Sequence, residues 1–284
     1  MTLLTLVEKL ESDADKMFTP LCDGRMVWHL WGSGTPLVLL HGGSGSWSHW
    51  VKNIEVLSQH YRLLVPDLPG LGDSDNPPFY FDPKDYAASV PKLAETISAG
   101  ISHILGDTAF HLCGFSFGSI VGGYVAADVN NRLLSFTLVG ASAFGWPWKG
   151  LKTPFQSMTP GMTERERLNV QKLNLSNAML TSKVDYDLAQ LQLNNVSRAR
   201  LRTHMVTETN VLMAGLAKVK VPLNGIWGSA DVYAQPNLSR IEHLLRSIEP
   251  NAQFEVIEGA GHWVMLDAPK EFQSRLLRAL EREG

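Results

Sequence analysis

A serine between two glycines is the residue of this sequence best suited to covalent chemistry. Residues 114–118 read Gly-Phe-Ser-Phe-Gly, after an apolar run at 110–113 and before a helical pattern over 119–130. A sharp turn from strand to helix exposes a serine hydroxyl, and flanking glycines let neighbouring backbone pass close to it. The positive end of the helix also favours developing negative charge. We therefore expect Ser116 to be a nucleophile, against the alternative of a chance match in a glycine-containing loop.

A serine hydroxyl needs a base, and the base needs an acid that fixes its tautomer. Of the nine histidines, His262 follows the last apolar run (254–257) in a glycine-containing turn. Asp231 follows the run at 223–227 and lies between the serine and the histidine in the chain. The order Ser, Asp, His is one of the known orders of such a triad. We expect His262 to be the base and Asp231 the acid, and the alternative for each is a purely local role in its turn.

Acyl transfer also requires hydrogen-bond donors for an oxyanion. Residues 41–45 read His-Gly-Gly-Ser-Gly after an apolar run, so we expect the N–H groups of Gly43 and Phe117 to form this site. A phosphate-binding loop is disfavoured, because neither G-K-[ST] nor the spacing G-x-G-x-x-G is present. We interpret His41 as holding the loop. Asp67, which precedes the serine, is interpreted as part of a structural turn.

Short apolar runs alternate with helical patterns along most of the chain, which indicates a parallel sheet covered by helices. The runs expected to form strands are 26–31, 37–40, 62–65, 110–113, 136–139, 223–227 and 254–257. Helical patterns cover 83–105, 119–130 and 269–282, and Leu3, Leu6, Val7 and Leu10 fit one helical face. Between 145 and 212 no buried strand is evident, so we expect a helical cap at 145–212 inserted into a core formed by 1–144 and 213–284.

Composition restricts the function further. The formal net charge of -3 lacks the basic surplus that proteins clamping nucleic acid usually show. Two cysteines outside any CxxC pair suggest neither a disulfide framework nor a zinc site, and favour a reducing, cytoplasmic compartment. No signal peptide or bilayer-spanning run is evident. We expect a small-molecule substrate, no cofactor and no metal, and the sequence leaves the oligomeric state open.

Taken together, these motifs resemble the α/β-hydrolase superfamily over nearly the whole chain. The matching residues in family order are His41-Gly42-Gly43, Asp67-Leu68-Pro69-Gly70, Gly72, Ser74, Gly114, Ser116, Gly118, Asp231 and Gly261-His262. The resemblance implies a mostly parallel eight-stranded sheet flanked by helices, with a cap over the C-terminal strand ends. Ser116 excludes the epoxide hydrolases and haloalkane dehalogenases of similar layout, which use aspartate at this position.

Within the superfamily, the chain looks like the capped branch that contains carboxylesterases and hydrolases of meta-cleavage products. The latter cleave carbon–carbon bonds, and their histidine–tryptophan pair is similar to His262-Trp263. Their loop after the first His-Gly is longer than the one here, and the asparagine that they carry near the helix after the Asp67 turn is absent around 86–89. The residues that we expect to contact substrate are Trp146, Trp148, Trp263 and the cap arginines Arg198, Arg200 and Arg202.

The formal charge of the cap is +4 against -7 for the rest of the chain, so one inward arginine could bind a substrate carboxylate. We place the three arginines on a helix, where at most one or two can face the site. The first functional hypothesis is an ester or thioester hydrolase acting through an acyl-enzyme. The alternatives are a carbon–carbon hydrolase with the same triad and a non-catalytic ligand receptor on the same fold.

Overall fold

Eight strands form one sheet in the computed structural model, which describes residues 1–21, 23–77, 79, 85–147 and 150–281. The strands are β1 (Asp15–Leu21), β2 (Gly24–Trp31), β3 (Pro36–Leu40), β4 (Arg62–Pro66), β5 (Phe110–Phe115), β6 (Leu133–Val139), β7 (Leu223–Gly228) and β8 (Gln253–Ile257). Their order across the sheet is β1-β2-β4-β3-β5-β6-β7-β8. Only the pairings β1–β2 and β2–β4 are antiparallel. The mostly parallel eight-stranded sheet that the family resemblance implies is therefore confirmed.

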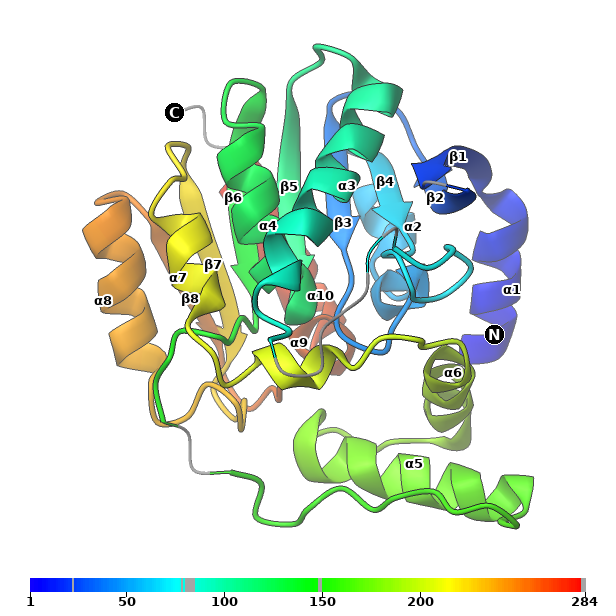
Figure 1. The fold of residues 1–284 in the computed structure, drawn as a ribbon. Coiled ribbons are helices and arrows are strands. Elements are labelled where there is room, and N and C mark those ends of the chain that lie inside the picture. The colour runs from blue at the N-terminus through cyan, green and yellow to red at the C-terminus, as the bar shows by residue number, and fades with distance from the viewer. Residues whose placement is uncertain (22, 78, 80–84, 148–149, 282–284) are drawn as a thin grey trace.

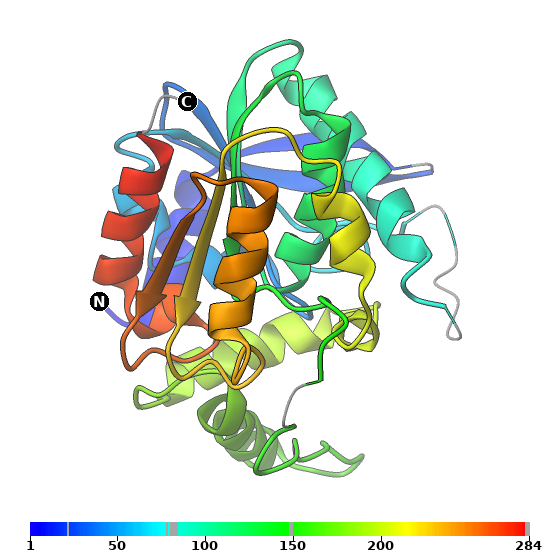
Figure 2. The same ribbon diagram turned by 90° about the vertical axis from the view of Figure 1, so that its left-hand side faces the viewer.

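Helices cover both faces of this sheet (Figure 2). The helices are α1 (Leu3–Asp13), α2 (Ile54–Leu57), α3 (Ser89–Leu105), α4 (Phe117–Asp128), α5 (Glu164–Ala178), α6 (Tyr186–Ser197), α7 (Val211–Leu216), α8 (Leu238–Ile248), α9 (Val264–Asp267) and α10 (Pro269–Leu280), with 3-10 turns η1 (Trp47–Trp50) and η2 (Thr203–Val206). One apolar core joins α3, α4, α7 and α8 to the sheet, and a second joins α1, α2, α9 and α10 to the other face. The central strands β3 and β5 are buried along their whole length, which explains their continuous apolar runs.

The first strand was not expected from the sequence. β1 pairs antiparallel with β2 along the edge of the sheet, and only Thr19 and Leu21 of its seven residues are buried. Its outward positions include Lys16 and Pro20, which are typical of an edge strand that must not pair further. A half-exposed strand of this kind lacks an apolar run, so the sequence pattern did not reveal it.

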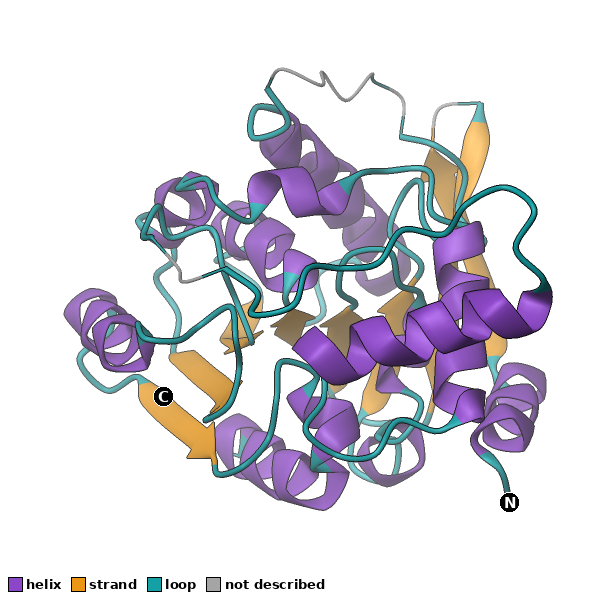
Figure 3. Ribbon diagram, turned by 90° about the horizontal axis from the view of Figure 1, so that it is seen from below, coloured by secondary structure: helices purple, strands orange, loops and turns teal. Residues whose placement is uncertain are grey.

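The segment between β6 and β7 contains α5, α6, η2 and α7. In Figures 1 and 3, α5 and α6 lie beyond the ends of the strands, where the chain leaves β5 and β6. Leu188 and Leu191 of α6 join the second apolar core, so this helix is packed onto the rest of the molecule. Helix α7 crosses the predicted boundary at residue 212 and packs on α4, where the Gly215 backbone lies against Gly123. No helix in the described ranges is long and apolar enough to cross a bilayer.

Candidate active site

Ser116 lies at the turn that joins β5 to α4. Its φ of 49° is in the left-handed region, which a non-glycine residue adopts only when its surroundings hold it there. Its N–H donates to the Val139 carbonyl at 2.8 Å, which fixes the turn against the neighbouring strand. A Cβ on Gly118 would lie 2.3 Å from the Leu40 carbonyl oxygen, so only glycine fits there. The sharp turn predicted around Ser116 is present, and it leaves this side chain partly exposed.

His262 follows β8 and reaches over the sheet to Ser116. Its Nε2 lies 3.1 Å from Ser116 Oγ, and its Nδ1 lies 2.9 Å from Asp231 Oδ2. Because a carboxylate only accepts hydrogen bonds, Nδ1 carries the proton and the Nε2 lone pair faces the serine hydroxyl. The imidazole contacts the rings of Phe115 and Tyr233, with centroids at 5.2 and 4.6 Å. This arrangement can remove the proton of the Ser116 hydroxyl.

Asp231 follows β7 and is almost fully buried, with 1% of its surface exposed. Its second oxygen, Oδ1, accepts from the Tyr233 N–H at 2.9 Å, so both oxygens have a donor. Asp67, the earlier aspartate, accepts from the N–H groups of Trp47 and Asp73, each at 2.8 Å. Burial raises the pKa of the Asp67 carboxyl. These two hydrogen bonds join Asp67 to the backbone of two nearby turns, which agrees with the structural role that the sequence suggests.

Gly43 and Phe117 lie close together beside Ser116. A Cβ on Gly43 would lie 3.8 Å from the Phe117 Cβ and 2.2 Å from Thr203 Oγ1. Within the described chain, neither the Gly43 nor the Phe117 amide donates a hydrogen bond. Two free amides next to a nucleophile are suited to an oxyanion, so the predicted pair remains our candidate.

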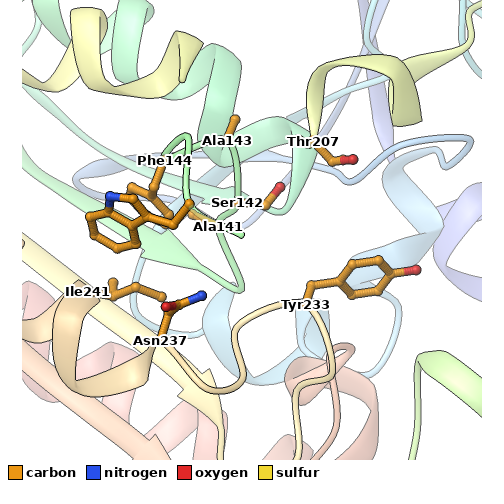
Figure 4. A pocket seen from close by; sticks show the side chains of 9 residues that line it. Ala141, Ser142, Ala143, Phe144, Thr207, Tyr233, Asn237 and Ile241 are labelled. Atoms are coloured by element: carbon orange, nitrogen blue, oxygen red, sulfur yellow. The ribbon is translucent and has the colours of Figure 1, made fainter. Parts of the chain in front are cut away.

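A small cavity of about 30 Å³ adjoins this site. It is lined by Ala141, Ser142, Ala143, Phe144, Trp146, Thr207, Tyr233, Asn237 and Ile241. Ser142 comes from the segment after β6, and Tyr233 lines the cavity from the segment after β7 (Figure 4). Tyr233 links the cavity to His262, and Trp146 stacks on Phe144 with ring centroids 5.1 Å apart. The Ser142 Oγ is buried and makes no hydrogen bond within the described residues, so a substrate atom could bond to it.

The other residues expected at the substrate lie in different places. Trp263 is buried against His49 at a centroid distance of 4.8 Å and is not among the residues that line the cavity. Trp148 lies outside the described residues. The three arginines follow α6 in a turn, so the expectation that they share a helix is wrong.

Two of these arginines already have partners on the core. Arg198 pairs with Asp73 at 2.8 Å. Arg200 donates to Asn76 Oδ1 at 2.9 Å and also to the Ser74 carbonyl. Arg202 is exposed, so contact of any of the three with a substrate remains a prediction.

Sequence reasoning missed one buried histidine beside the site. His49 is fully buried in η1 and contacts the Gly42 amide and the Gln192 side chain. No partner for His49 could be predicted, because Gln192 lies 143 residues further along the chain. The only local signal is its place eight residues after His41, at the end of the glycine-rich loop.

Comparisons with known proteins find relatives among hydrolases. The chain is 39% identical over 104 residues to a soluble epoxide hydrolase of Corynebacterium sp. (strain C12), covering 37% of this chain and only 34% of that enzyme. It is 26% identical over 264 residues to a 2-hydroxy-6-oxononadienedioate/2-hydroxy-6-oxononatrienedioate hydrolase of Paraburkholderia phymatum, with 85% of each protein covered.

Among solved structures, an esterase from Rhodococcus sp. ECU1013 has a similar fold. The TM-score is 0.75 at 22% identity, and the match covers 96% of this chain and 100% of the esterase. The model of the alpha/beta hydrolase family matches residues 37–274, a span that includes Ser116, Asp231 and His262. The chain belongs to the α/β-hydrolase family.

Proposed function

We propose that this protein is a serine hydrolase that cleaves small carboxylic esters through an acyl-enzyme. The observation that carries the proposal is the continuous chain of contacts from Asp231 through His262 to Ser116, at 2.9 and 3.1 Å. Asp231 fixes the tautomer of His262, this tautomer leaves the Nε2 lone pair free, and Nε2 faces the Ser116 hydroxyl. The strained turn at Ser116 supports the same assignment, because such strain is found where a side chain must be presented for reaction.

In the proposed reaction, Ser116 Oγ attacks the ester carbonyl carbon and its proton moves to His262 Nε2. The carbonyl oxygen becomes an oxyanion, which the N–H groups of Gly43 and Phe117 would stabilise. His262 then returns the proton to the leaving alcohol as the carbon–oxygen bond breaks. Water, deprotonated by the same histidine, hydrolyses the acyl-enzyme and restores the Ser116 hydroxyl. Asp231 stays ionised and stabilises the imidazolium in both steps.

The cavity favours a neutral substrate group. Among the described residues, its lining combines the rings of Phe144, Trp146 and Tyr233 with the hydroxyl of Ser142 and includes no lysine or arginine; the nearby Arg240 lies over the Trp146 ring at 4.1 Å. Arg198 and Arg200 have partners on the core segment 73–76. We therefore rank an ester with a small apolar acyl or alcohol group above a dianionic substrate, and we propose that segment 145–212, as a cap, selects this group through Trp146.

Carbon–carbon hydrolysis is the second candidate. The relative from Paraburkholderia phymatum is named as a 2-hydroxy-6-oxononadienedioate/2-hydroxy-6-oxononatrienedioate hydrolase. In addition, His262-Trp263 is similar to the histidine–tryptophan pair of the meta-cleavage product hydrolases. The same triad could serve that reaction, so the two substrates must be compared directly. A purified protein that hydrolyses meta-cleavage diketo acids faster than nitrophenyl esters would favour this candidate.

The decisive experiment combines active-site labelling with burst kinetics. We expect a fluorophosphonate probe to label the wild-type protein and nitrophenyl acetate to give a burst of nitrophenol. Ser116→Ala should abolish both, with a loss of turnover on the order of 10⁴-fold. Ser176→Ala, which changes an exposed serine on α5, is the matched control and should label normally. Labelling that persists in Ser116→Ala contradicts the assignment, and a protein with neither burst nor label favours the receptor.

A further inference from the structure

A buried polar cluster joins α6 to the loop that carries Gly43. Its five members are His49, Gln192, Asn195, Ser46 and Ser48, and all of them are buried. Gln192 and Asn195 are three residues apart, so they project from one face of α6 toward the loop. Polar side chains are costly to bury unless they are hydrogen-bonded, and these are. The cluster therefore fixes the relative position of the helix and the loop.

Asn195 and Gln192 bond to separate parts of the loop. Asn195 Oδ1 accepts from Ser46 Oγ at 2.8 Å, and its Nδ2 donates to Ser48 Oγ at 3.1 Å. Gln192 Nε2 donates to the Ser44 carbonyl at 3.1 Å, and its Oε1 accepts from the Asn195 amide at 3.2 Å. The amide orientations are thus set by the whole cluster, which leaves Gln192 Oε1 as an acceptor facing His49.

His49 has one proton and uses both of its ring nitrogens. Its Nδ1 accepts from the Gly42 N–H at 3.3 Å, so the proton must lie on Nε2, which donates to Gln192 Oε1 at 3.2 Å. Burial lowers the pKa of His49 to about 4, so the ring is neutral at ordinary pH. A Cβ on Gly45 would lie 2.2 Å from His49 Cε1, so the loop closes directly over the ring.

The Gly42 backbone is held on both sides. Its N–H bonds to His49, and its carbonyl accepts from His41 Nδ1 at 2.8 Å. In a trans peptide the N–H of the next residue points opposite to the carbonyl. The Gly43 N–H is therefore directed away from His41, and Thr203 packs against the Gly43 Cα.

We propose that His49 is a positioning residue for the oxyanion site: its Nδ1 holds the Gly42 amide, and Gln192 of α6 holds the ring. The segment expected to act as a cap would then contribute to the rate as well as to substrate choice. This inference rests on the proposed function, because it assigns the Gly43 N–H to an oxyanion.

Substitutions at His49 separate the two contacts. His49→Phe keeps a planar ring but removes the acceptor for the Gly42 N–H. We expect kcat to fall by about 10- to 100-fold, which does not exceed the effect of removing an oxyanion donor outright. KM should stay within about twofold of the wild-type value. His49→Asn places an amide oxygen near the position of Nδ1, so kcat should recover to within about fivefold of wild type.

A transition-state analogue supplies a readout that loss of packing alone would not move. An aryl trifluoromethyl ketone adds to the serine hydroxyl and leaves its oxygen as an oxyanion. Its inhibition constant should rise in His49→Phe by the same factor by which kcat falls, and it should recover in His49→Asn. If His49→Phe has the kcat and the inhibition constant of the wild type, the proposal is overturned. It is also overturned if His49→Asn loses as much kcat as His49→Phe while its melting temperature is unchanged.

Gln192→Met tests the role of α6 if His49→Phe does not fold. It leaves the His49 Nε2–H without an acceptor, and we expect kcat to fall about 3- to 10-fold at unchanged KM. Gln273→Met is the matched control, because it removes another buried glutamine, on α10, which bonds to the Lys52 carbonyl after η1 and not to His49 or the glycine-rich loop. Equal kcat values for the two variants contradict the proposal. If the proposed function itself is wrong, the wild-type protein is not labelled by the fluorophosphonate and does not turn over esters. This result is distinguishable from a failure of the proposal for His49, in which the wild type is active and only the variants behave differently from expectation.

Discussion

Replacing Asp231 with asparagine changes one buried carboxylate oxygen to an NH₂ group and hardly alters the size of the side chain. The two oxygens of Asp231 accept from different donors, the His262 Nδ1–H at 2.9 Å and the Tyr233 N–H at 2.9 Å. An asparagine has one acceptor oxygen for these two donors, so the variant must choose between them.

The two orientations have different consequences. If the amide oxygen faces Tyr233, the NH₂ group donates to His262 Nδ1, which moves the histidine proton to Nε2 and leaves no base for Ser116. If the oxygen faces His262, the correct tautomer is kept, but the NH₂ group meets the Tyr233 N–H. A buried donor without an acceptor costs about 1–3 kcal/mol, so this second orientation is populated about 5- to 150-fold less.

The expected kcat of Asp231→Asn follows from these populations. The favoured orientation has the wrong tautomer, for which a loss of about 10⁴-fold is the known scale. The minor orientation keeps a small active fraction with a less stabilised imidazolium, so we expect a loss between about 10² and 10⁴ in kcat. Nitrophenyl acetate turnover measures this loss, and fluorophosphonate labelling at long times checks that Ser116 is still present and accessible.

Asp67→Asn is the matched control, because Asp67 is also buried and each of its oxygens also accepts from one donor, in this case a backbone N–H group. It lies in the structural turn, so this variant should lower the melting temperature and leave kcat of the folded fraction near wild type. The reasoning is refuted if Asp231→Asn is fully active while folded Asp67→Asn is inactive. That result identifies Asp67 as the acid.

Three further changes test other parts of the site. Gly43→Ala places a Cβ 2.2 Å from Thr203 Oγ1, so the loop must shift; kcat should fall about 10²-fold in steady-state assays, and an unchanged kcat contradicts the oxyanion assignment. Arg200→Met should lower the melting temperature and affect anionic and neutral esters equally; a loss of about 2–5 kcal/mol in kcat/KM for the anionic ester alone supports a carboxylate-binding arginine instead. Burial lowers the pKa of His41 to about 3 and of His49 to about 4, so the unfolded chain binds more protons below the ordinary histidine value of about 6.5. Each histidine should reduce the free energy of unfolding by about 1.4 kcal/mol per pH unit as the pH falls from 6 to 4, and denaturant titrations of His49→Asn should show a shallower dependence.

Much of the fold and the three central residues could be predicted because each motif adjoins a strand. Ser116, Asp231 and His262 follow β5, β7 and β8, and parallel strands bring their carboxyl ends to one edge of the sheet. A residue that follows such a strand is therefore near the other strand ends, however far away it is in the chain. The structure brings these three side chains together, although their catalytic roles remain proposals.

The parts that were missed depend on contacts that no local pattern records. Edge strand β1 exposes most of its residues, so its apolar signal is weak. The bonds from His49 to Gln192 and from Arg198 to Asp73 join segments more than a hundred residues apart. A helical period over 198–202 was expected, but α6 ends at Ser197 and Arg198 is its C-cap. Without the fold, the arginines could not be assigned partners on the core.

The contacts of α6 also bear on how substrate enters. Asp187 near its start accepts from the Leu3 N–H of α1 at 3.1 Å, Asn195 is bonded to the glycine-rich loop, and Arg198 at its end pairs with Asp73. A helix attached at its start and along its last turn cannot move away without breaking these contacts, of which the bonds of Asn195 are buried. Helix α5 is fixed mainly at its C-terminal end, where its C-cap Met179 accepts from the Trp263 N–H and Leu175 joins the second apolar core. Its first turn, residues 164–167, is exposed, and movement for substrate entry is therefore expected there, while α6 stays fixed and keeps the proposed oxyanion site in place.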